Sequence, residues 1–253
     1  MSAFAQRPPT DHRIDLSAFD GAIIDLDGTM VDTLGDFVVA VNLMLDELCL
    51  PGAPVLQRVQ VERLVGKGSE HLVNSVLNQL QVQALPAQSA IDKKADLTQA
   101  DRHALYEAAF ASYQKHYTAI NGQHAAVYPG VVDGLQALQQ AGLKLACLTN
   151  KPVSFARALL VQKGLDGFFI EVFGGNSFAR KKPDPLPLLE TFKALGTSAG
   201  RTLMIGDSSN DAVAARAAGC PVVLVTYGYN HGVPIRHVDA DGFVDSLAGL
   251  ACL

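Results

Sequence analysis

The chain has 253 residues, which is enough for one large domain or two modest ones. Apolar residues make up 49% of it, which excludes a globally disordered protein. The formal net charge of −5 argues against a nucleic-acid binder, which needs a basic stripe, but a small anionic substrate needs only a local positive site.

The cysteines predict a reducing environment. Because they lie far apart and form no CxxC pair, they favour neither a disulfide framework nor a zinc cluster; they are Cys49, Cys147, Cys220 and Cys252. We find no apolar stretch near the N-terminus that suits a signal peptide. We also find no apolar segment as long as the roughly 18 residues needed to cross a bilayer. We therefore expect a cytoplasmic protein without a membrane partner.

The stretch AIIDLDGTMVDT at residues 22–33 places acids after a buried segment. Residues 22–27 form an apolar run that predicts a strand, and this run ends in Asp25 and Asp27. An Asp-Gly pair can also mark a hairpin, but the residues that follow turn helical instead of forming a second alternating strand. The other alternative is that these acids only form a turn or a helix cap.

Residues 34 to about 120 differ from the rest of the chain. Their apolar residues recur with helical spacing, and no convincing strand separates them. Thr98 and Asp101 predict a capping box at the start of one helix, and the polar segment 81–97 predicts a loop. We therefore predict an all-helical cap over 34–125, inserted after the first strand.

From residue 126 onward, short apolar runs alternate with helical segments. The runs predict buried strands at 144–150, 170–175, 202–207 and 221–228. Strands that alternate with helices of this length imply right-handed crossovers and a parallel sheet. Residues 18–33 and 126–253 are thus expected to form a Rossmann-like, doubly wound α/β core.

Polar side chains follow three of these strands. They are Asp25 and Asp27, Thr149 and Asn150, and Asp207 with Asp211 close behind. Each could be a simple helix cap, and Lys182 could be a solvated loop lysine. Since ligands bind outside the carboxyl ends of strands in an open parallel sheet, their joint occurrence favours one shared site.

The chemistry of this predicted site suits a phosphoryl group. Clustered carboxylates repel one another unless a cation compensates them, and four acids here suit the hard ion Mg²⁺: Asp25, Asp27, Asp207 and Asp211. Lys182 and Thr149 would bind an anion. Metal, lysine and hydroxyl together make a site for phosphate chemistry.

Four elements in this order resemble the haloacid dehalogenase superfamily, over about residues 20–247: D-x-D-G-T at 25–29, the strand ending in Thr149, Lys182 before proline, and G-D-x-x-x-D at 206–211. The resemblance implies that Asp25 is the nucleophile, forming an aspartyl-phosphate, and that Asp27 is the acid and base. It implies that Thr149 and Lys182 hold the phosphoryl oxygens. It also implies that Mg²⁺ is bound by Asp25, the Asp27 carbonyl and Asp207, with Asp211 as a further ligand or as a partner of these ligands. Gly28, Thr29 and Asn150 would contact the substrate.

The acid at Asp27 argues against a dehalogenase, because a halide needs no proton. Four stretches are also similar to bacterial phosphoglycolate phosphatases, namely 148–152, 181–189, 206–221 and 226–232. This similarity implies hydrolysis of 2-phosphoglycolate to glycolate and phosphate. A sugar-phosphate phosphatase, a phosphomutase and a non-catalytic phosphate-binding protein remain alternatives, although the last would be expected to have lost Asp25 or Asp27.

Substrate selection is expected to come from the cap. Lys67 stands between Gly66 and Gly68, which allow a tight turn and a close approach to a ligand. Lys67 could therefore reach the carboxylate of a small phosphorylated acid, or it could be an ordinary solvated lysine. The sequence leaves the oligomeric state open.

Overall fold

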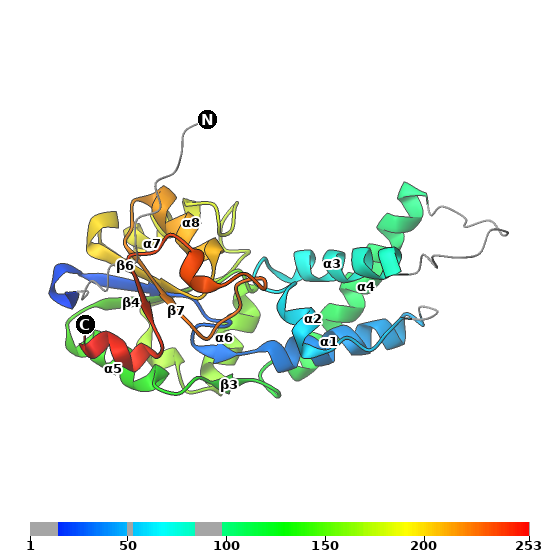
Figure 1. Cartoon of the computed structure of the whole chain (residues 1–253), viewed down its shortest axis with the longest axis horizontal. Coiled ribbons are helices and arrows are strands. Elements are labelled where there is room, and N and C mark those ends of the chain that lie inside the picture. Colours follow the sequence, from blue (N-terminus) through cyan, green and yellow to red (C-terminus); the bar gives the residue numbers. More distant parts are fainter. Residues whose placement is uncertain (1–14, 50–52, 84–97, 253) are drawn as a thin grey trace.

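The computed structural model describes residues 15–49, 53–83 and 98–252, and it places a parallel sheet beside a helical cap (Figure 1). The sheet has six strands in the order β5-β4-β1-β6-β7-β8, and every neighbouring pair is parallel. Numbered along the chain, this is the order 3-2-1-4-5-6 of doubly wound nucleotide-binding folds. The predicted fold class is confirmed.

The strands are shorter than predicted. Their bounds are β1 Gly21–Ile24, β4 Lys144–Leu148, β5 Glu171–Phe173, β6 Thr202–Gly206, β7 Val222–Val225 and β8 Gly242–Val244. The expected strand over 22–27 ends at Ile24, although the Asp25 N–H still donates to the Ile205 carbonyl at 2.9 Å. The sequence prediction missed β8, because three residues at the sheet edge make no apolar run.

Helices cover both faces of the sheet (Figure 1): α5 (Val131–Gln140) and α6 (Val153–Gln162) on one, α7 (Leu186–Leu195) and α8 (Ser209–Ala218) on the other. Ala22 and Ile24 of β1 pack into the first layer, and Ile23 packs into the second. Because both faces are buried, the strands read as continuous apolar runs. Short 3₁₀ helices complete the core at Leu16–Ala18, Asp166–Phe168, Ala199–Arg201, Ile235–His237 and Leu247–Cys252.

The cap helices have a hydrophobic cluster of their own. They are α1 (Leu34–Glu47), α2 (Arg58–Glu62), α3 (Ser69–Gln83) and α4 (Gln99–Ile120). The capping box of Thr98 and Asp101 is confirmed at the start of α4. The predicted loop over 81–97 is wrong at its start, since 81–83 continue α3, and 84–97 lie outside the described residues.

A two-stranded antiparallel pair marks the passage between sheet and cap. It joins β2 (Val31–Asp32) to β3 (Ala126–Val127) and was not predicted. Beside it, the buried Asp36 carboxylate accepts the N–H groups of Gly122 and His124 at 2.7 Å each. The pair lies beside the predicted boundaries of 33/34 and 125/126, and the domain division stays a prediction. Among the described helices, none has the length and apolar character to span a membrane.

Candidate active site

Three neighbouring strands deliver the predicted site residues to one edge of the sheet. Asp25 follows β1, Thr149 follows β4 and Asp207 follows β6, and β1 lies between the other two strands. Their side chains line one pocket, which encloses about 570 Å³ of space including open solvent and is also lined by cap residues. The pocket thus lies at the topological switch point, where such folds bind ligands.

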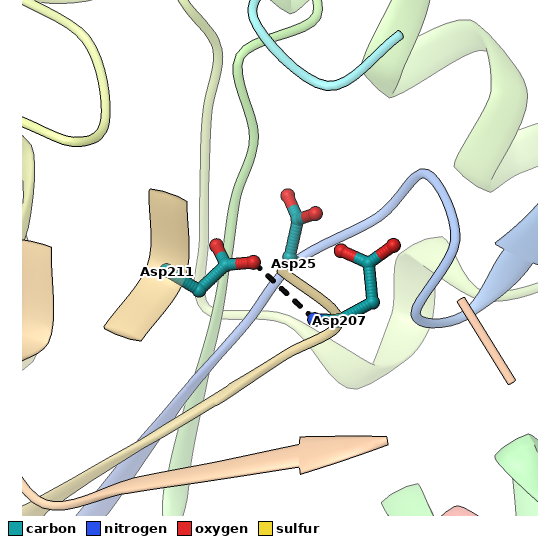
Figure 2. A group of neighbouring side chains, drawn as sticks. All are labelled: Asp25, Asp207 and Asp211. Carbon is teal, nitrogen blue, oxygen red and sulfur yellow. Dashed lines mark hydrogen bonds between the residues drawn. The ribbon is translucent and has the colours of Figure 1, made fainter. Parts of the chain in front are cut away.

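Three carboxylates meet in this pocket (Figure 2). Asp25, Asp207 and Asp211 are buried, and one oxygen from each lies within 4.8 Å of the others. Burial raises the pKa of Asp25 and of Asp207 above the usual range, and repulsion by Asp211 adds to both shifts. A set of crowded, poorly solvated oxygen donors fits a hard divalent cation, which would offset their charge.

Asp211 differs from the other two because protein groups occupy both of its oxygens. Its Oδ1 accepts from Lys182 Nζ at 2.7 Å. Its Oδ2 accepts from Ser208 Oγ at 2.9 Å and from the N–H groups of Asp207 and Ser208 at 3.2 Å, the former drawn in Figure 2. Asp211 therefore closes the capping box of α8 and fixes Lys182, which leaves Asp25 and Asp207 better placed to bind a cation.

Lys182 is a buried cation beside the nucleophile candidate. Its ammonium group donates to Asp25 Oδ1 at 2.9 Å, to the Leu148 carbonyl at 2.8 Å, and to Asp211. Burial opposes its charge, but Asp211 and Asp25 outweigh that effect and hold the pKa of Lys182 above its ordinary value. Lys182 thus stays charged next to the Asp25 carboxylate, as an anion-binding role requires.

In Asp27, only one of the two carboxylate oxygens accepts hydrogen bonds from described residues. Thr33 Oγ1 and Lys151 Nζ both donate to its Oδ1, at 2.7 and 2.8 Å. Within the described residues, Oδ2 of Asp27 has no hydrogen-bond partner, although it belongs to a side chain that is only 14% exposed. The carboxyl group is therefore held by one oxygen, while the other has no protein partner among the described residues.

Lys151 was missed by the sequence analysis. Its side chain is buried, its ammonium donates to Tyr117 OH at 2.7 Å, and it lies 4.7 Å from the centre of the Phe37 ring. Its position directly after Thr149 and Asn150 was a signal that could have found it. Its contact with aromatic residues of the cap could not be predicted from the sequence.

Asn150 and Asn210 join the core to the cap. The Nδ2 groups of both residues donate to the Gly66 carbonyl at 3.1 Å, and Asn150 also donates to the Lys182 carbonyl at 2.8 Å. A further contact joins Lys181 Nζ to Glu70 at 2.6 Å. These bonds hold the cap loop against the sheet edge, so the pocket has a wall from each part.

Three predicted substrate residues are not part of the described pocket wall: Gly28, Thr29 and Lys67. A Cβ on Gly28 would lie 2.0 Å from Asp207 Oδ2, so this glycine lets Asp207 approach the strand end. Thr29 is buried, and its hydroxyl has no hydrogen-bond partner within the described ranges; Lys67 is exposed. Their contact with a substrate stays a prediction.

Comparison with known proteins places these features in a family. The sequence model of haloacid dehalogenase-like hydrolases matches residues 22–225. A phosphoglycolate phosphatase of Thiobacillus denitrificans is 41% identical over 91% of this chain and 93% of its own length. A plasmid-encoded phosphoglycolate phosphatase of Cupriavidus necator is 40% identical over 91% of each chain. The crystal structure of a predicted phosphoglycolate phosphatase from Haemophilus somnus aligns with a TM-score of 0.81 at 29% identity, over 92% of this chain and 96% of that one.

Proposed function

The chain belongs to the haloacid dehalogenase-like hydrolases, and from this premise we propose that it is a Mg²⁺-dependent phosphatase acting on 2-phosphoglycolate. The main support for phosphatase chemistry is the pair of acids after β1. Asp25 lies against the buried Lys182, and Asp27 is held by one oxygen with the other bare. The names of the relatives from Thiobacillus denitrificans and Cupriavidus necator support the substrate.

In the proposed first step, a carboxylate oxygen of Asp25 attacks phosphorus while the bond between phosphorus and the glycolate oxygen breaks. The proton on Asp27 passes to that leaving oxygen. Lys182 and the Thr149 hydroxyl hold the phosphoryl oxygens. The products of this step are glycolate and a phosphorylated Asp25.

In the second step, Asp27 takes a proton from a water molecule, and the water oxygen attacks phosphorus. The bond between Asp25 and phosphorus breaks, which releases phosphate and restores both carboxyl groups to their starting states. Mg²⁺ held by Asp25, the Asp27 carbonyl and Asp207, with Asp211 beside them, would neutralise charge that develops on the phosphoryl oxygens. Binding of the ion would also offset the mutual repulsion of the buried acids.

A panel of phosphate esters tests this function. We expect the highest kcat/KM with 2-phosphoglycolate, release of one phosphate for each glycolate, and loss of activity when Mg²⁺ is chelated. A preference for sugar phosphates such as glucose 6-phosphate would instead support the sugar-phosphate alternative. Isomerisation of a sugar phosphate without phosphate release would identify a mutase. Binding of esters without turnover of any would support a binding protein.

The metal site gives a second test, through Gly28→Ala. The added Cβ would displace the Asp207 carboxylate. A metal ligand that is held in the wrong position lowers the affinity for the metal by about 10- to 100-fold. We expect the Mg²⁺ concentration for half-maximal activity to rise by about that factor. The rise in Tm that Mg²⁺ produces in the wild type should shrink in parallel.

Gly142→Ala is the matched control for Gly28→Ala. Gly142 has a φ of +86°, close to the +83° of Gly28, but a Cβ there would meet no atom of a described residue within 4 Å. Both variants therefore suffer the backbone strain of an alanine at positive φ, of the order of 1–2 kcal/mol, and only one disturbs Asp207. Equal Mg²⁺ dependence in the two variants would contradict a role of Asp207 in holding the ion.

The absence of nucleic-acid and membrane partners and a cytoplasmic location stay predictions of the sequence. We propose a small phosphorylated acid as the main binding partner.

A further inference from the structure

The Tyr113 hydroxyl is a buried donor with no hydrogen-bond partner in the part of the chain that the structure describes. Tyr113 lies on α4 of the cap, its side chain is fully buried, and it lines the pocket. Among the described residues, no group forms a hydrogen bond with this hydroxyl. Because burying an unpaired polar group is costly, such a group in a binding pocket points to a ligand that completes it.

Burial raises the pKa of Tyr113 well above its ordinary value, and the charge of Lys151 opposes this only in part. The phenol therefore stays protonated and can donate a hydrogen bond at neutral pH. The nearby Ser69 side chain acts against this rise of the Tyr113 pKa, although the two hydroxyls do not have the geometry of a hydrogen bond. Tyr113 and Ser69 are thus neighbouring hydroxyls on one pocket wall.

Ser69 also begins a long helix. It is the first residue of the 15-residue helix α3, and it follows Gly68, which has a φ of +92° and also lines the pocket. The first N–H groups of any helix lack acceptors within the helix, and the helix dipole favours an anion there. The start of α3 and the Tyr113 hydroxyl therefore both suit a negatively charged acceptor.

Lys151 supplies positive charge from the core side of the same region. Its ammonium group has three N–H groups, and Asp27 and Tyr117 are its acceptors among the described residues. Tyr117 in turn stacks on Tyr113, with 5.5 Å between ring centres. Asp27, Lys151, Tyr117 and Tyr113 thus form a continuous chain of contacts from the proton donor of the reaction into the cap.

We propose that Tyr113, Ser69 and the start of α3 form a subsite for the carboxylate of the substrate. This subsite rests on the proposed function and would bind the leaving group of that reaction. Lys182 and Thr149 lie at the phosphate end, and Asp27 must face the ester oxygen, so the rest of the leaving group extends toward Lys151 and the cap. In 2-phosphoglycolate, one CH₂ group separates the ester oxygen from the carboxylate, which accepts hydrogen bonds and carries the charge that these donors favour.

Tyr113→Phe tests the subsite with little effect on packing, because it keeps the ring that stacks on Tyr117. The readout is the ratio of kcat/KM for 2-phosphoglycolate to kcat/KM for ethyl phosphate, which has the same phosphate and first carbon but no carboxylate. We expect Tyr113→Phe to lower this ratio by about ten- to a hundredfold, mainly through a higher KM. Ser69→Ala should lower it in the same direction.

Two further measurements separate binding from turnover and from folding. In the background of Asp25→Asn, calorimetry with 2-phosphoglycolate should show a similar loss of affinity for Tyr113→Phe. The Tm without ligand should stay the same or rise, since the change removes an unpaired buried hydroxyl. Tyr106→Phe is the matched control, because Tyr106 lies on the same helix and outside the described pocket wall, and it should leave the ratio unchanged.

The outcomes distinguish this inference from the proposed function. A wild-type enzyme that does not hydrolyse 2-phosphoglycolate would overturn the proposed function, and the subsite with it. A wild-type enzyme that does hydrolyse it, with the same ratio in Tyr113→Phe, would overturn the subsite alone. A fall of the ratio in Lys67→Ala but not in Tyr113→Phe would assign the carboxylate to Lys67 and would also overturn the subsite.

Discussion

Asp25→Asn should abolish hydrolysis of 2-phosphoglycolate while the fold stays intact. The amide has nearly the shape of the carboxylate but lacks the nucleophilic oxygen that attacks phosphorus. Lys182 would keep two of its three acceptors, Asp211 and the Leu148 carbonyl, so its burial remains compensated. Phosphate release, measured with Mg²⁺ in excess, should fall to background, and the circular dichroism spectrum should not change.

The surface residue Asp20 provides the control for this substitution. Asp20→Asn disturbs an exposed pair with Arg201 outside the pocket, and activity should remain that of the wild type. Acid quenching of wild-type enzyme during turnover, followed by mass spectrometry, should find phosphate on Asp25. Mg²⁺-dependent activity above a trace in a clean preparation of Asp25→Asn would remove Asp25 from the mechanism.

Asp27→Asn should lower kcat for 2-phosphoglycolate by about 10²–10⁴, the usual contribution of a positioned acid and base. The asparagine oxygen can still accept from Lys151 and Thr33, as Oδ1 of Asp27 does, so the side chain should keep its position. What is lost is the group that we propose to donate and accept the proton. The effect should therefore appear in kcat with little change in Tm.

The dependence on the leaving group separates proton transfer from a structural role of Asp27. The nitrophenolate released from p-nitrophenyl phosphate needs no proton, whereas the glycolate alkoxide does. In single-turnover phosphorylation of the enzyme, Asp27→Asn should therefore slow 2-phosphoglycolate much more than p-nitrophenyl phosphate. Equal losses for both substrates would show that Asp27 is not the acid.

Much of the candidate site could be predicted from the sequence, because it depends on local order along the chain. Asp25, Thr149 and Asp207 each follow an apolar run, and alternation of such runs with helices implies a parallel sheet. In a parallel sheet, the carboxyl ends of the strands must meet at one edge. The position of these residues at a common pocket therefore needed no knowledge of side-chain packing.

Only the tertiary structure decided how these groups are held and which cap residues face them. The Lys151 ammonium bonds to Asp27, which lies 124 residues away, and to Tyr117 on a cap helix. The buried hydroxyl of Tyr113, which has no partner among the residues described, could not be predicted from the sequence either, because tyrosines of this kind usually belong to a helix core. Such contacts are set by the docking of the cap on the sheet, and docking depends on the shapes of both surfaces together rather than on any local pattern.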